Sequence, residues 1–119
     1  MSKVKLAIVG LGGIAQVIHM PILSRMEDVE ITAVCDSDLS KSKNIASRYN
    51  VGKYYEDIEK MLEENPEVSA VIIAAQTNVH KDISIKCLQA EKDILIEKPI
   101  ARNYKEAKEI LDAAKLYKK

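Results

Sequence analysis

The sequence predicts an α/β fold, a parallel sheet with helices on both faces, in one domain covering residues 1–119. Two observations support this. Short apolar segments rich in β-branched residues alternate with longer amphipathic segments, as in strands joined by crossover helices. The first apolar segment also runs directly into a turn containing Gly10, Gly12 and Gly13, and a helix-like stretch comes after it. That succession is typical of a doubly wound sheet of the Rossmann type.

Strands are expected at five apolar segments, which are residues 4–9, 30–35, 53–55, 69–75 and 93–97. The fourth is apolar almost throughout, as in a central parallel strand covered on both faces. Right-handed crossovers place these strands in the order 3-2-1-4-5. The sixth strand of the full fold is missing from this order. The fifth strand is therefore expected to be an uncovered edge, and pairing between such edges would make a homo-oligomer.

Helices are expected at residues 13–26, 38–49, 57–64 and 79–90, with a last one after Asn103. Pro21 should break the first near His19 or Met20, because proline has no N–H to donate. Asp38 can cap the second helix, and Asn50 and Gly52 can end it, since both residue types tolerate left-handed backbone angles. The last helix begins with a capping box of Asn103 and Glu106, and its apolar stripe is Tyr104, Ala107, Ile110, Leu111, Ala114 and Tyr117.

Composition excludes several classes of protein. Lys and Arg total 18, as do Asp and Glu, so charge gives no reason to expect a nucleic acid or membrane partner. No segment has the length of a transmembrane helix, and the N-terminus does not read as a signal peptide. Cys35 and Cys87 match no metal or redox spacing, so buried thiols and no metal site are expected. A cytoplasmic protein follows by elimination.

The glycine turn has the pattern G-x-G-x-x-A, with Gly10, Gly12 and Ala15 at its fixed positions. Gly10 permits the tight turn, Gly12 lets the backbone approach a pyrophosphate, and Ala15 lets the helix pack closely on the sheet. Gly13 and Ile14 lie in the same turn and are expected to bind the cofactor with it. The alternative is that the glycines serve packing alone.

Asp36 stands at the end of the second expected strand, 21 residues beyond Ala15, where dinucleotide-binding proteins carry an acid. A carboxylate there accepts hydrogen bonds from the adenosine ribose and repels a 2′-phosphate. The next residues are Ser37 and Asp38, with no Lys or Arg immediately beside it. NAD is therefore predicted, and NADP is disfavoured. The alternative is that Asp36 merely ends a strand.

Glu97-Lys98-Pro99 follows the fifth expected strand. Together with the glycine turn and Asp36, it resembles the N-terminal NAD(P)-binding domain of the Gfo/Idh/MocA oxidoreductases (glucose–fructose oxidoreductase, inositol dehydrogenase). The resemblance spans essentially the whole chain. Residues 19–23 resemble the family's broken first helix. Residues 75–80 resemble its T-P-x-x-x-H loop, with Ala75 and Gln76 in place of Thr and Pro.

The resemblance implies that Lys98 is the catalytic lysine and that Glu97 lies near the nicotinamide end. A partly desolvated lysine can assist removal of a hydroxyl proton during hydride transfer. Pro99 should hold Lys98 in extended geometry. On residue type alone, Lys98 would be a surface lysine before a proline.

The loop after the fourth strand supplies the other expected cofactor contacts, Ala75, Thr77, Asn78 and His80. Thr77 and Asn78 can equally be turn and cap residues, and His80 can equally be a packing or capping residue. His19 is assigned to the helix break rather than to chemistry.

These residues predict the NAD-binding domain of an oxidoreductase that transfers a hydride between a nicotinamide cofactor and a sugar- or polyol-like alcohol. The family's substrate domain is not within these residues, so the isolated chain is expected to bind NAD weakly without turnover. One alternative is a stand-alone regulatory nucleotide-sensing module, like those attached to potassium channels. A methyltransferase-type domain is disfavoured, because Val9 stands where that class carries an acid.

Overall fold

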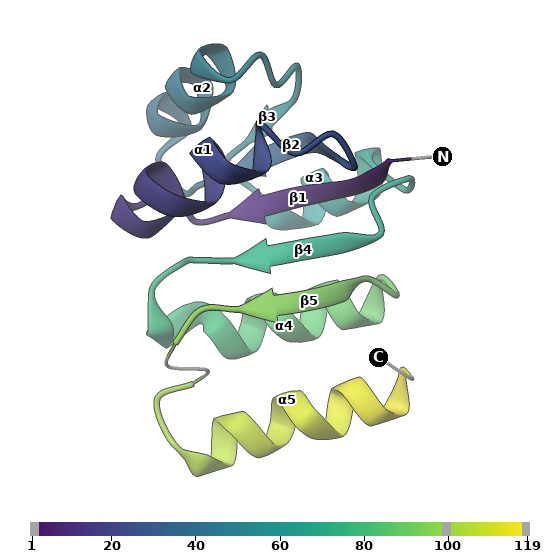
Figure 1. Cartoon of the computed structure of the whole chain (residues 1–119). Helices are drawn as coiled ribbons and strands as arrows, with labels where there is room; N and C mark the ends of the chain where they lie inside the picture. Colours follow the sequence, from purple (N-terminus) through teal and green to yellow (C-terminus); the bar gives the residue numbers. More distant parts are fainter. Residues whose placement is uncertain (1–2, 99–100, 118–119) are drawn as a thin grey trace.

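The computed structural model describes residues 3–98 and 101–117, and Figure 1 shows their course. Parallel strands form one sheet in the order β3-β2-β1-β4-β5, which confirms the predicted order. The strands are β1 (Val4–Val9), β2 (Val29–Cys35), β3 (Tyr54–Tyr55), β4 (Ala70–Ile73) and β5 (Asp93–Ile96). Because all pairs are parallel, every strand ends at the same edge of the sheet, and the loops that follow them meet there.

Helices cover the two faces of the sheet in different places (Figure 1). The π-helical turn η1 (Ala15–His19), α1 (Met20–Leu23) and α2 (Leu39–Arg48) cover one face over the β1–β2–β3 half. On the other face lie α3 (Ile58–Glu64) and α4 (His80–Gln89), the latter preceded by the 3₁₀ turn η2 (Thr77–Val79). Finally, α5 (Tyr104–Leu116) packs beside α4.

Strand alternation divides the core in two, one half on each face of the sheet. Leu6 and Ile8 of β1 face α1 and α2, whereas Ala7 and Val9 face α3 and α4. Both cysteines belong to the second half, and the prediction that they are buried free thiols is confirmed. Burial raises the pKa of each thiol to about 12, so both are protonated and unreactive at neutral pH.

The first helix changes its hydrogen bonding where Pro21 was expected to interrupt it. The Met20 N–H donates to the Ala15 carbonyl, five residues back, as in a π-helix. Pro21 follows at once and has no N–H, so the regular pattern cannot continue through it. The expected break is therefore a wide turn rather than a gap, and the helix ends at Leu23, three residues earlier than predicted.

The ends of the other helices agree with their predicted caps. Asp38 caps α2, and its carboxylate accepts the Lys41 N–H. Asn50 has a φ of 58°, the left-handed geometry expected after that helix, whereas Gly52, the other residue expected to end it, has no positive φ. Asn103 caps α5 by accepting the Glu106 N–H at 3.0 Å. The Glu106 carboxylate, however, accepts the N–H of Arg102 rather than that of Asn103, which shifts the second half of the capping box by one residue.

The predicted apolar stripe of α5 is wrong at two positions. Tyr104 is 80% exposed and Leu111 is 61% exposed, whereas Ile110 is buried. Among the described residues α5 packs mainly on α4, so only one side of the helix is covered. Periodicity identified an apolar face but not how much of it has a partner. None of the helices within residues 3–98 and 101–117 is long and apolar enough to cross a membrane.

Replacing Gly10 with alanine should destabilise the fold strongly. Gly10 has a φ of 91°, and a Cβ there would lie 2.3 Å from the Ala75 nitrogen. We expect Gly10→Ala to lower the free energy of unfolding by about 3 kcal/mol or more, measured by urea denaturation. The matched control is Gly13→Ala, where nothing lies within 4 Å, and its change should stay within about 1 kcal/mol. Equal losses in both variants would contradict this account.

Acid should selectively remove the contribution of Glu106. The Arg102 guanidinium donates to both carboxylate oxygens, at 3.2 and 2.6 Å, and lowers the pKa of Glu106 to about 2. A lowered pKa stabilises the fold above the ordinary carboxyl pKa of 4.5, and this contribution disappears as pH falls towards 2. The melting temperature of Glu106→Gln should therefore lie below the wild type at neutral pH and converge with it in acid. Asp112→Asn, in the more exposed Lys108–Asp112 pair, should show a smaller gap. A gap for Glu106→Gln that persists at pH 2 would refute the assignment.

Candidate functional site

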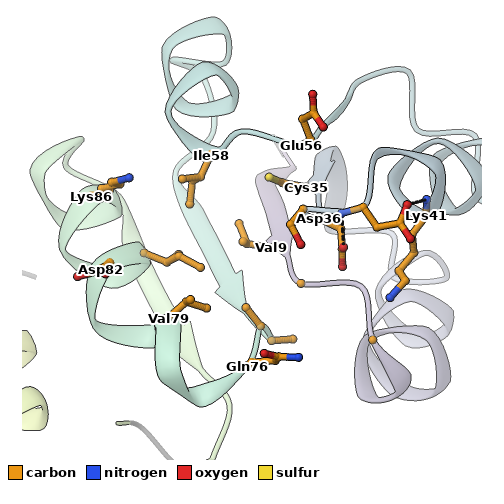
Figure 2. Close-up of a pocket in the computed structure, with 17 residues that line it drawn as sticks. Val9, Cys35, Asp36, Lys41, Glu56, Ile58, Gln76, Val79, Asp82 and Lys86 are labelled. Atoms are coloured by element: carbon orange, nitrogen blue, oxygen red, sulfur yellow. Dashed lines mark hydrogen bonds between the residues drawn. The ribbon is translucent and has the colours of Figure 1, made fainter. Parts of the chain in front are cut away.

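A cavity of about 560 Å³ opens at the carboxyl ends of β1, β2 and β4. The glycine turn after β1 and the loops after β2 and β4 form part of its wall. Figure 2 shows Asp36 and Lys41 on one side and Val79, Asp82 and Lys86 of the η2–α4 segment on the opposite side. In a doubly wound sheet this is the crevice where ligands bind, because the crossovers diverge on either side of it.

Gly10 brings two loops of the site together. Its N–H donates to the Cys35 carbonyl at 2.8 Å, which holds the turn against β2. Its Cα faces Ala74 and Ala75 so closely that no side chain fits between them. Gly12 also lines the cavity, and the space where its Cβ would stand is open. Ala15 is fully buried, as expected of a small residue between the helix and the sheet.

The Asp36 carboxylate is held by two backbone donors at the cavity wall. Its Oδ2 accepts the Leu11 N–H at 2.8 Å, and its Oδ1 accepts the Asp38 N–H at 2.9 Å. The first bond ties β2 to the glycine turn, 25 residues earlier. A carboxylate oxygen has two lone pairs, so each oxygen retains one for a further donor. The arrangement fits a ligand with neighbouring hydroxyl groups, such as a ribose.

Lys41 is a site residue that the sequence analysis missed. It lies three residues after Asp38, in the first turn of α2, and lines the cavity near Asp36 (Figure 2). It is not adjacent to Asp36 in the sequence, but one helical turn returns a later residue to the same side. Because Asp38 was predicted to cap this helix, Lys41 could have been predicted in its first turn, close to Asp36.

The far wall of the cavity is an apolar slot. Ile58 of α3 and Ile83 of α4 line it, with Val79 of η2. Apolar walls of this kind accept a flat ring, while the polar rim orients the rest of the ligand. At the end of the slot, Lys86 bonds to Glu59 at 2.9 Å, and that hydrogen bond raises the pKa of Lys86. The slot was not predicted, because its residues come from three separate elements.

His80 lies behind the site rather than on its surface. Its side chain is 1% exposed, and Nε2 lies 2.6 Å from the Ala75 carbonyl. A carbonyl only accepts, so Nε2 carries the hydrogen and donates it. The ring thereby holds the loop after β4 in the position that contacts Gly10.

The remaining predicted residues lie along the same sheet edge but outside the cavity wall. Ile14 is 41% exposed. Asn78 and Lys98 are exposed, and Thr77 is half-buried. Pro99, which was expected to orient Lys98, lies outside the described residues. The cavity wall therefore includes Asp36 and its neighbours but not Lys98.

One contact on the open side was not foreseen. His19, the last residue of η1, bonds through Nε2 to Oε1 of Glu97, the residue after β5. The two are 78 positions apart in the chain, and no local pattern could pair them. Across residues 3–98 and 101–117, no three His, Cys, Asp or Glu side chains are placed to hold a metal ion.

Two relatives of known sequence share most of this chain. The trans-1,2-dihydrobenzene-1,2-diol dehydrogenase of Xenopus laevis is 36% identical over 90 residues, which are 76% of this chain and 27% of that protein. The D-glucoside 3-dehydrogenase of Escherichia coli strain K12 is 30% identical over 115 residues, 96% of this chain and 32% of that enzyme. The chain thus spans about a third of the length of the curated relatives it matches.

Solved structures and a family model agree with the sequence relatives. A Gfo/Idh/MocA family oxidoreductase from Vibrio cholerae superposes with a TM-score of 0.88 at 29% identity, covering 97% of this chain and 36% of that one. Residues 4–119 match the model of the Gfo/Idh/MocA oxidoreductase family with an NAD-binding Rossmann fold. The glycine turn and the strand order agree with these comparisons: this chain belongs to the Gfo/Idh/MocA oxidoreductase family and is its N-terminal NAD-binding Rossmann domain.

Proposed function

We propose that this domain serves a hydride transfer between NAD and a sugar- or polyol-like alcohol. The observation that carries the proposal is the cavity at the β1, β2 and β4 ends, with the Asp36 carboxylate held between two backbone N–H groups. The names of the relatives, dehydrogenases of a cyclic diol and of a glucoside, support an alcohol carbon as hydride donor.

Each part of the dinucleotide has a matching part of the site. The backbone N–H groups of Gly12, Gly13 and Ile14, at the start of the first helix, face the diphosphate. Those of Gly10 and Leu11 are bonded to the Cys35 carbonyl and the Asp36 carboxylate instead. The two Asp36 oxygens accept the adenosine ribose hydroxyls. The adenine enters the slot between Val79, Ile83 and Ile58. The nicotinamide half then extends from Gly12 towards Thr77, Asn78, Glu97 and Lys98.

NAD is proposed over NADP on the balance of charge around Asp36. Asp36 and Asp38 both line the cavity beside the ribose position, whereas Lys41 adds a cation to that wall. A 2′-phosphate would lie beside the Asp36 carboxylate, where the two negative charges repel each other. It could avoid this only by taking over the Leu11 and Asp38 N–H groups that now hold Asp36. Lys41 balances part of this charge, so removal of Asp36 should make the site more tolerant of NADP.

Lys98 is proposed as the residue that assists loss of the hydroxyl proton. It lies at the carboxyl edge, directly after Glu97, and its side chain is exposed. Hydride transfer requires a substrate held close to the nicotinamide, and Lys98 does not line the cavity.

We expect the 119-residue chain to bind NAD without turnover, measured as no NADH formed from NAD with inositol or glucose.

Calorimetric titration with NAD and NADP tests the role of Asp36. Asp36→Asn removes the charge and one acceptor, so NAD should bind about tenfold more weakly, the loss expected for a charged hydrogen bond. NADP should bind more tightly than it does to the wild type.

Asp38→Asn is the matched control, because it also removes one charge beside the site, and asparagine caps a helix as well as aspartate does. Its NAD affinity should stay within about twofold of the wild type. No saturable NAD binding by the wild type, or equal losses in the two variants, would contradict the proposal.

A further inference from the structure

We propose that His19 is a positioning residue for the nicotinamide half of the cofactor, acting through Glu97 and through the chain that leads from Glu97 into Lys98. The proposal rests on the proposed function, because it assigns a role within the same site. It starts from the bond between His19 Nε2 and Glu97 Oε1.

The contact joins two parts of the fold that are not neighbours in the sheet. His19 ends the turn that follows β1, and Glu97 follows β5. In the sheet, β4 lies between those two strands. The bond therefore links the segments after β1 and β5 across the end of β4. Both side chains are mostly buried, 16% and 23% exposed, so water competes weakly for the bond.

Glu97 is held at two points as a result. Its backbone N–H donates to the Ile73 carbonyl of β4 at 2.9 Å. Its side chain is held by His19, and since an ionised carboxylate only accepts, Nε2 carries the hydrogen. Within the described residues Oε2 has no other partner, so it is available to a donor on the ligand. The amide group of the nicotinamide carries such a donor.

The wide turn before Pro21 sets the direction of the His19 side chain. A π-helical turn contains one residue more than an α-helical turn, and the extra residue rotates the next part of the helix by about 100° around the axis. His19 is the last residue of that turn. The irregular backbone before Pro21 thus has a consequence beyond tolerating proline, because it directs an imidazole at the end of β5. Wide turns of this kind are frequent at functional sites.

Titration with NAD and with ADP-ribose separates this role from binding in general. ADP-ribose has the adenosine, diphosphate and second ribose but lacks nicotinamide. In His19→Ala, NAD should bind about tenfold more weakly, while ADP-ribose should stay within about threefold. His19→Gln should restore most of the NAD affinity, because the glutamine amide places an N–H donor near the position of Nε2.

Two further variants keep the test specific. If His19 acts through Glu97, adding His19→Ala to Glu97→Ala should cause no further loss, as a double-mutant cycle would show. Ser24→Ala, directly after the same helix, is the matched control, since it removes the bond of Ser24 to the Pro21 carbonyl. Its NAD affinity should match the wild type, and melting temperatures confirm that each variant is folded.

The outcomes distinguish the two proposals. If the wild type binds neither ligand, the proposed function fails and this inference fails with it. If the wild type binds both ligands but His19→Ala weakens both equally, weakens neither, or is not rescued by His19→Gln, the function stands and the positioning role of His19 is refuted.

Discussion

The site depends on the close approach of Gly10 to the loop after β4. With backbone against backbone at this point, the turn after β1 and the loop after β4 share one wall of the cavity. His80 supports that loop from behind by bonding to the Ala75 carbonyl. The crossovers then leave on opposite faces of the sheet, which opens the crevice between them. A side chain at residue 10 would separate these loops and remove the geometry on which every other contact depends.

Electrostatics then determine what the crevice accepts. The two backbone N–H groups that hold Asp36 fix the carboxylate before any ligand arrives, so little side-chain entropy is lost on binding. Lys41 lines the same cavity and adds a positive charge beside Asp36 and Asp38. At the opposite end, the His19–Glu97 pair is mostly buried, and the neighbouring Lys98 is exposed. The two ends thus differ: at one the carboxylate of Asp36 is already fixed, and at the other a lysine is free of the cavity wall.

Local sequence patterns predicted the helices and strands but not the contacts between residues far apart in the chain. Alternation and caps predicted the elements, the cap at Asp38 and the turn at Asn50, because each depends on neighbours in the chain. The strand order followed from the general handedness of crossover connections. The predicted burial of Tyr104 in α5 was wrong, because an amphipathic pattern does not say how much of a helix face its neighbour, here α4, will cover. His19 was assigned to a helix break, and the break exists as a wide turn. Its pairing with Glu97 requires the completed sheet, which brings together residues that no sequence window contains.

The most direct test of the account is a ¹H–¹⁵N NMR titration of the labelled chain with NAD. The account predicts the largest shift changes at the amides of the glycine turn and of Ser37 and Asp38, with smaller ones at the loop after β4 and none along the exposed side of α5. Saturation with NAD that leaves the amides of Gly10, Gly12 and Leu11 unchanged would contradict it.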